Sequence, residues 1–180
     1  IVEIIKEKSK EKDYNYSDFA ILYRTNAQSL NIETSLRREN IPYIIIGGIS
    51  FYRRAEIKDV MAYLTLLVNP QDSEALLRAV NEPPRGIGNT SLGHIKEFAK
   101  ENSITLYDAF LNVGKVSNLQ QRAVNAVDIF VNLIEKYRKI IINDNDTEFI
   151  IKYIMDTGIM DMYKEMNTEA ALDKWNNIQQ

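Results

Sequence analysis

The fold is decided by residues 19–29, which read FAILYRTNAQS. The first five of them form an apolar run of the length expected for a strand that is buried on both faces of a mostly parallel sheet. Polarity begins abruptly at Arg24, and Thr25 and Asn26 carry side chains that can cap a following helix. The stretch therefore predicts a buried strand that leads directly into a helix.

Arg24 is the candidate functional residue of this stretch. Ligands of open α/β sheets collect at the carboxyl ends of the strands, where Arg24 is expected to lie. Its planar guanidinium suits phosphate oxygens, and the ring of Tyr23 offers a face on which a base can stack. The pattern predicts a nucleotide site, while a surface ion pair of Arg24 beside a core tyrosine is the second interpretation.

The composition is that of an ordinary globular protein. The 180 residues are 45% hydrophobic and 26% charged, which is enough for one sizeable core or two small ones. A net charge of -3 argues against bulk coating of nucleic acid, so any DNA contact must be local. The absence of cysteine excludes disulfides, thiolate catalysis and thiolate metal sites, and the presence of one histidine leaves little for a zinc site. No apolar run reaches the roughly 18 residues of a membrane span, and we expect a cytoplasmic protein.

Patterns further along the chain extend the predicted fold. Residues 43–46, YIII, predict a second buried strand, which would complete a β-α-β unit with a right-handed crossover. From about residue 56 the chain reads as helix after helix. The predicted class is an incomplete α/β part with a short parallel sheet in residues 1–115, followed by an all-α part in residues 116–180, mostly helical overall. Helices are predicted at about 1–10, 27–40, 56–68, 74–80, 91–102, 105–111, 119–142, 148–155 and 170–180.

A dense group of helix-breaking residues lies at 81–91, NEPPRGIGNTS. Two glycines around one apolar residue, immediately before a helix start, expose consecutive backbone amides at the favourable end of the helix dipole. Such a loop can bind a phosphate without a large net charge, and the arginine before it adds a charged donor. The alternative is a plain helix-helix turn in which glycine supplies a positive φ. The candidate DNA-binding residues here are Arg85, Gly86, Ile87, Gly88, Asn89 and Thr90.

A second basic block, FYRRAEIKD at residues 51–59, has two interpretations. Glu56 lies in the first turn of a predicted helix, where it could pair with Arg54 or Lys58 in an ion network that holds the loop. Alternatively, Arg53 or Arg54 contacts the phosphates of a single strand while a neighbouring aromatic ring lies near a base. The residues alone leave both open.

Three stretches resemble the superfamily-1 DNA helicases of the UvrD/PcrA/Rep family. They are residues 19–29, which resemble helicase motif IV, GGISFYRRAEIKDVMAYLTLLVNP at 47–70, and RAVNEPPRGIG at 78–88. The resemblance implies that residues 1–115 are the first part of the second RecA-like motor domain, subdomain 2A, with an incomplete P-loop NTPase-type fold. Residues 116–180 would be part of the helical insertion, subdomain 2B. Such enzymes use ATP with Mg²⁺ to step along single-stranded DNA in the 3′-to-5′ direction during repair or replication.

The resemblance also implies roles for individual residues. Tyr23 would stack on adenine, and Arg24 would reach the γ-phosphate and act catalytically as a sensor of nucleotide state. Gln28 completes the motif. The loop at 85–90 would hold DNA near the junction of single strand and duplex, and Lys164 and Lys174 would touch the duplex. The implied partners are single-stranded DNA, the junction, ATP and the first motor domain of the same chain, which would hold the Mg²⁺ ligands.

The chain also departs from the family pattern. Leu30 stands where an arginine usually follows Gln-Ser, and Asn176 stands where an acidic residue is expected before Asn177. No GxxxxGK[ST] motif and no acidic magnesium-binding strand motif are present. We therefore expect the isolated chain neither to hydrolyse ATP nor to unwind DNA. The alternatives are a non-catalytic helix-hairpin-helix DNA-binding or protein-interaction module, and a part of a RecB/AddA-like helicase-nuclease.

Overall fold

The regular structure of this protein is helical. The computed structural model describes residues 1–11, 14–24, 27–46, 50–141 and 147–179. Short 3₁₀ turns at Tyr16–Asp18, Phe51–Arg53 and Val113–Lys115 link some of the α-helices. The α-helices are α1 (Val2–Lys10), α2 (Ala27–Arg38), α3 (Ala55–Val68), α4 (Ser73–Ala79), α5 (Asn89–Glu101), α6 (Leu106–Leu111), α7 (Gln121–Ile141), α8 (Thr147–Asp156), α9 (Ile159–Glu165) and α10 (Glu169–Ile178).

The predicted parallel sheet is wrong, because the described ranges contain no β-strand. Residues 19–23 and 43–46, which were expected to be strands, are irregular. Phe19, Ile21 and Tyr43 pack on a small apolar cluster, but Leu22 is 95% exposed. Ile44 and Ile46 are also largely exposed, at 84% and 88%. A strand buried on both faces needs neighbours on each side, and these segments are packed on one side only.

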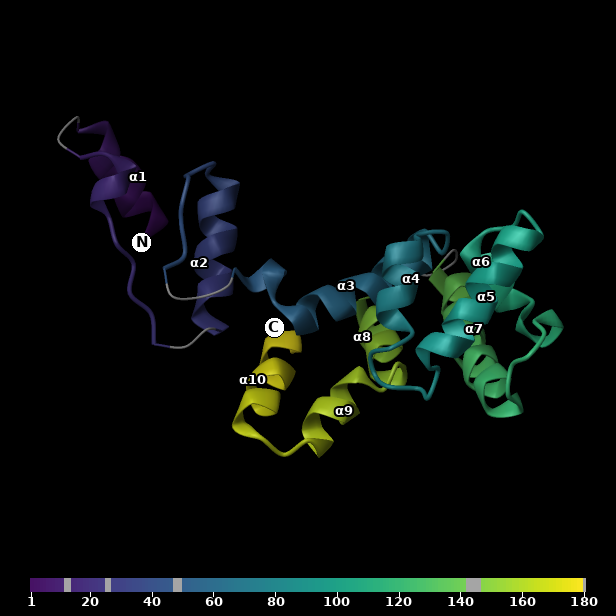
Figure 1. The fold of residues 1–180 in the computed structure, drawn as a ribbon. Coiled ribbons are helices and arrows are strands. Elements are labelled where there is room, and N and C mark those ends of the chain that lie inside the picture. Colours follow the sequence, from purple (N-terminus) through teal and green to yellow (C-terminus); the bar gives the residue numbers. More distant parts are fainter. Residues whose placement is uncertain (12–13, 25–26, 47–49, 142–146, 180) are drawn as a thin grey trace.

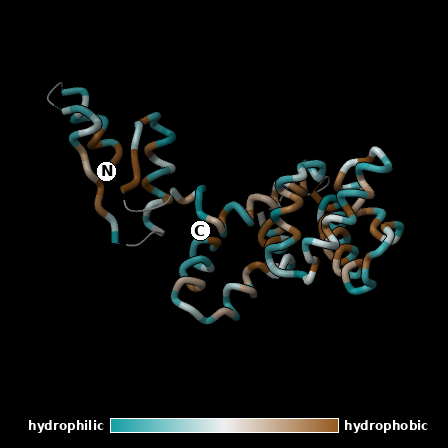
Figure 2. Tube along the Cα trace, viewed as in Figure 1, coloured by the Kyte–Doolittle hydropathy of each residue, from teal (hydrophilic) through white to brown (hydrophobic). Residues whose placement is uncertain are grey.

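The N-terminal region, residues 1–46, is built from α1, α2 and the segments that flank them (Figure 1). Its cluster has three buried apolar side chains, Ile5, Leu36 and Ile41, with half-buried neighbours around them. Figure 2 shows the apolar stretches of this region running beside the helices. Little apolar surface is thus removed from water here.

The helical body, which extends from α3 to α10, contains the main core. The longest helix, α7, has buried residues at positions 123, 127, 130, 131, 134 and 137, which form one stripe along a helix face. Edge-to-face ring contacts join Phe130 to Tyr63 and Phe110, with centroids 6.4 and 6.3 Å apart. The fully buried aromatic side chains are Tyr63, Tyr107, Phe110, Phe130, Tyr137 and Tyr153.

Helix α3 joins the two regions (Figure 1). It packs against α4 and α7 of the body, while α10 returns to lie against it, so the C-terminus is close to the start of α3. The main core draws on residues before and after position 115. The domain boundary at 115/116 stays a prediction about the organisation of the longer protein.

The predicted helices at 27–40, 56–68 and 119–142 are confirmed to within two residues at their ends, as α2, α3 and α7. None of the helices in the described ranges has both the length and the apolar character of a membrane span.

Candidate nucleotide and nucleic-acid interfaces

Tyr23 and Arg24 lie on the surface at the end of the irregular segment that precedes α2. The Tyr23 ring is 36% exposed, and the Arg24 side chain is also exposed. The backbone N–H of Arg24 donates to Oε1 of Gln28, 2.9 Å away, so a helix side chain holds the backbone of the candidate arginine. The predicted caps Thr25 and Asn26 lie outside the described residues. The structure thus brings the three motif residues together and leaves the guanidinium facing solvent.

Glu33 on α2 binds the residues at the start of the 3₁₀ turn Phe51–Arg53. Glu33 is only 2% exposed. Its carboxylate accepts hydrogen bonds from the Ser50 hydroxyl at 2.6 Å and the Phe51 backbone N–H at 3.1 Å. The Tyr43 hydroxyl donates to the same carboxylate at 3.2 Å. One buried charge therefore ties α2 to the 3₁₀ turn that leads into α3.

The hydrogen bonds around Glu33 also determine its ionisation. Burial alone raises the pKa of this carboxyl, because the charged form loses hydration. The donors from Ser50, Phe51 and neighbouring hydroxyls outweigh that penalty, and the pKa lies below its ordinary value of 4.5. Glu33 is therefore charged at neutral pH, and its hydrogen bonds contribute most where it is ionised.

The structure separates the two adjacent arginines of the basic block. Arg54 is buried, and its Nη1 donates to Oδ1 of Asn177 on α10 at 2.8 Å. Its Nη2 donates to the Ser29 hydroxyl on α2 at 3.1 Å. The Asn177 amide in turn donates to Oε1 of Glu56 at 2.7 Å. Arg53, by contrast, is exposed. Arg54 therefore joins α2, α3 and α10, and Arg53 is the member of the pair that can meet a ligand.

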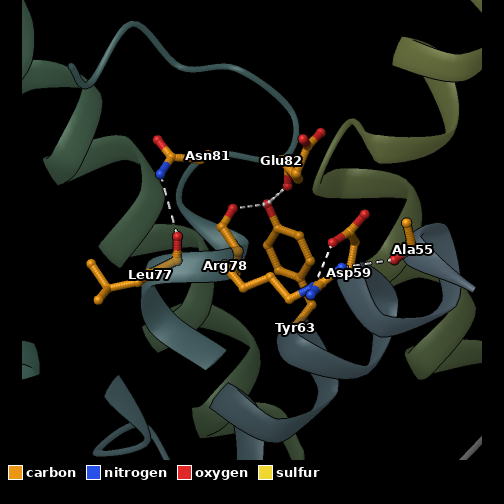
Figure 3. A network of polar contacts seen from close by, with 8 residues as sticks. Ala55, Asp59, Tyr63, Leu77, Arg78, Asn81 and Glu82 are labelled. Carbon is orange, nitrogen blue, oxygen red and sulfur yellow. Dashed lines mark hydrogen bonds and ion pairs between the residues drawn. The ribbon is translucent and has the colours of Figure 1, made fainter. Parts of the chain in front are cut away.

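A polar network forms the base of the loop at 81–88 (Figure 3). The Tyr63 hydroxyl points to the backbone carbonyl oxygens of Ala79 and Glu82, at 2.8 and 2.6 Å. Beside it, Arg78 donates from Nε to Oδ1 of the buried Asp59 at 2.6 Å. Burial raises the pKa of the Asp59 carboxyl, and the nearby Arg78 guanidinium only partly offsets this effect. These hydrogen bonds thus hold the start of the loop against α3 and the end of α4.

Arg85 lies inside this loop and bonds to the protein itself. Its Nη1 donates to the carbonyl oxygens of Ala79 and Pro83, at 3.1 and 2.9 Å. Its Nη2 donates to the carbonyl oxygen of Thr157, 3.0 Å away. The guanidinium carbon also lies 5.1 Å from the centroid of the Phe130 ring, which is within range of a cation-π contact. Arg85 therefore joins the loop to the end of α8 and to the main core.

The glycine pair of the loop has two different geometries. Gly86 has φ +74°, a left-handed conformation that side chains rarely adopt. Gly88 is the N-cap of α5 at φ -73°, where other residues are also allowed. Ile87 between them is buried in the main core. Asn89 and Thr90 are exposed on the first turn of α5, two residues earlier than the helix start that the sequence predicts.

The remaining predicted contacts lie on other helices. Lys164 is exposed on α9. Lys174 is half-buried on α10, and its Nζ lies 5.2 Å from the ring centroid of Tyr163. Figure 1 shows α9 and α10 well away from α5. Lys174 interacts electrostatically with Asp59 and with Glu82 of the loop. In the part of the chain that the structure describes, no cluster of three or more metal-binding side chains occurs.

A family comparison identifies the chain. The family model of the UvrD-like helicase C-terminal domain matches residues 1–180. The chain belongs to this UvrD-like family. It is 36% identical over 180 residues to the ATP-dependent DNA helicase PcrA of Leuconostoc citreum. It is 33% identical over 181 residues to that of Staphylococcus aureus and 34% identical to that of Staphylococcus epidermidis. These alignments cover 99–100% of the chain and 24% of each relative, so the chain spans about a quarter of their length. The expected resemblance to UvrD/PcrA helicases is confirmed.

Sequence reasoning did not assign Glu33 or Asn177 in this UvrD-like chain. The spacing of Ser29 and Glu33, four residues apart, places both on one face of α2 and was the one available signal. Asn177 lies 123 residues from Arg54, and no local pattern links the two. Both residues belong to hydrogen-bond networks that include α2.

Proposed function

We propose that the chain is part of an ATP-dependent DNA helicase, in which its N-terminal region contacts the nucleotide and its helical body contacts DNA. The names of the PcrA relatives support the reaction class. In the proposed organisation, residues 1–115 belong to the second motor domain and residues 116–180 to a helical insertion.

The observation that carries the nucleotide proposal is the placement of Arg24. Its side chain is exposed while its backbone is held by Gln28, so the guanidinium can meet a phosphate that another domain presents. The exposed face of Tyr23 can stack on adenine. In this proposal Arg24 stabilises the charge that develops as the terminal phosphate leaves.

The Mg²⁺ that accompanies ATP does not fit the described residues of this chain, which offer no carboxylate cluster for it. We therefore assign its ligands and the phosphate-binding loop to the other motor domain. Consequently, the isolated chain should show no ATP turnover.

The DNA part of the proposal places single-stranded DNA along Arg53 and the junction with duplex at the loop of residues 85–90. Arg53 is exposed beside the buried Arg54, and the first turn of α5 presents Asn89 and Thr90 to solvent. The proposed direction of movement is 3′ to 5′. Lys164 and Lys174 remain proposed duplex contacts, with Lys164 the more accessible of the two.

The test is Arg24→Ala in the full-length helicase that contains this sequence. We expect the DNA-stimulated kcat for ATP hydrolysis to fall about 10²- to 10³-fold, the range for loss of one group that stabilises transition-state charge. DNA affinity without nucleotide should be unchanged, because Arg24 is proposed to contact only ATP.

The matched control is Arg38→Ala, at the other end of α2, whose side chain is 77% exposed. This variant removes the same charge and should retain full turnover. Equal activity of the Arg24→Ala variant and the parent would contradict the proposed role, as would ATP turnover by the isolated 180-residue chain.

A further inference from the structure

We propose that Arg122 binds the nucleic-acid backbone phosphate at the loop of residues 85–90. The inference rests on the proposed DNA role of this loop and names the cation that acts there. In the sequence the obvious candidate is Arg85, and Arg122 lies 37 residues further along the chain, near the start of α7.

The first step is that Arg85 already donates its hydrogen bonds to acceptors within the protein. Its two terminal nitrogens donate to three backbone carbonyl oxygens, those of Ala79, Pro83 and Thr157. It also lies against the buried Phe130 ring. Turning it toward DNA would break three hydrogen bonds and leave the Pro83 and Thr157 carbonyl oxygens without this donor, which is costly. Arg85 therefore shapes the loop, and the phosphate ligand must be another residue.

The second step is the position of Arg122. A Cβ placed on Gly86 would lie 3.1 Å from Arg122 Nη2, 3.5 Å from its Nε and 3.6 Å from its Cζ. These are its three nearest atoms, so the guanidinium lies directly against the open side of Gly86. Tertiary packing thus places the guanidinium of Arg122, with its several N–H donors, beside Gly86.

The third step is that Arg122 is available. Its side chain is exposed, and among the described residues it takes part in no hydrogen bond or ion pair. Some cations of the body are paired, such as Arg78 with Asp59 and Lys136 with Asp156. The first turn of α5 beside the loop carries no acidic residue. An exposed guanidinium with unused donors at this point matches a phosphate in charge and in geometry.

The experiment titrates the 180-residue chain with a duplex that carries a single-stranded tail, at several salt concentrations between about 50 and 200 mM. We expect Arg122→Gln to weaken binding about three- to tenfold at the lower salt. The slope of log affinity against log salt should fall by about one, because one phosphate contact is lost. Arg122→Lys should keep the slope and regain part of the affinity.

The control is Lys100→Gln, which removes one exposed positive charge at the opposite end of α5, about 18 Å away at 1.5 Å per residue. It should leave the affinity and the salt slope unchanged. Thermal midpoints should be the same for both variants, because neither side chain is buried.

The possible outcomes separate the two proposals. If the parent binds DNA and Arg122→Gln has the affinity and slope of the control, the role of Arg122 is overturned while the DNA role of the loop stands. If the parent does not bind the tailed duplex, the DNA role of the loop fails and the role of Arg122 fails with it. Loss of binding by both variants to the same extent shows a general charge effect, which also overturns the specific role.

Discussion

The N-terminal region and the helical body are stabilised in different ways. The body has a continuous core with six fully buried aromatic side chains. The described residues of the N-terminal region include three buried apolar side chains, while Leu22, Ile44 and Ile46 are exposed to water. Its attachment to the body is polar, through the buried groups of Glu33, Arg54 and Asn177.

This difference matches the two proposed tasks. The loop proposed to bind DNA is built on the packed body, where Tyr63 and Arg85 hold its backbone. The proposed nucleotide contact lies in the lightly packed region, where local unfolding costs less free energy. We infer that the buried polar groups position Arg24 relative to the body, because apolar packing there is too sparse to do so.

The largest expected effect is on the body. Phe130→Ala should lower the free energy of unfolding by about 3–5 kcal/mol, since it empties the centre of the core and removes the ring beneath Arg85. Urea denaturation followed by circular dichroism measures the loss. The neighbouring Ile129→Ala is the control, because Ile129 is 69% exposed, and it should change stability by no more than about 0.5 kcal/mol. Similar losses in both variants would contradict the placement of the core.

The next effect is on the joint between the regions, which is formed by the hydrogen bonds of Arg54 with Asn177 and Ser29. Asn177→Ala removes the partner of Arg54 and Glu56 in a buried site and should destabilise the joint by about 1–3 kcal/mol. The emission of Trp175, the one tryptophan of the chain, reports the local change in urea titrations. Asn176→Ala alters the adjacent exposed side chain and should leave the titration unchanged. If the two variants behave alike, the polar joint contributes no stability.

The smallest effect is a pH dependence confined to the N-terminal region. The pKa of Glu33 is lowered in the folded state, so its stabilisation is complete above about pH 4.5 and is lost as the pH falls through the lowered value. Glu33→Gln should cost about 1–2 kcal/mol at pH 7 and remove this pH dependence.

Hydrogen exchange of the α2 amides at pH 7 and pH 3, corrected for intrinsic rates, measures the effect of Glu33. In the parent, protection of the α2 amides should fall between pH 7 and pH 3. In the Glu33→Gln variant it should fall less. The amides of α7 serve as the internal control, because they lie in the core of the body. A parent and variant with the same pH response would show that Glu33 carries no such dependence.

Most of the helices could be predicted from the sequence, and the sheet could not. The apolar stripe of α7 repeats at helical spacing over 21 residues, a local signal that packing reinforces. The apolar runs at 19–23 and 43–46 are short, and such runs indicate burial without stating what covers them. In the structure only one side of each run is covered, and neither run pairs as a strand among the described residues.

The candidate sites follow the same division. Tyr23, Arg24 and Gln28 lie within six residues of each other, and their proximity could be predicted because helix geometry brings a side chain back to the preceding turn. The choice between Arg53 and Arg54 could not be predicted, since it depends on Asn177 and Ser29 from distant parts of the chain. Nor could the sequence predict that Arg85 bonds within the protein while Arg122 lies beside Gly86.

The sequence by itself determined the family, most of the helices and the short stretches proposed to contact nucleotide and DNA, because these depend on residue type and local spacing. Only the tertiary structure decided which arginines are used internally and which face solvent. A guanidinium contacts whichever acceptors the folded chain places around it. Those of Arg54 include Ser29 on α2 and Asn177 on α10, and those of Arg85 include Thr157, just after the end of α8.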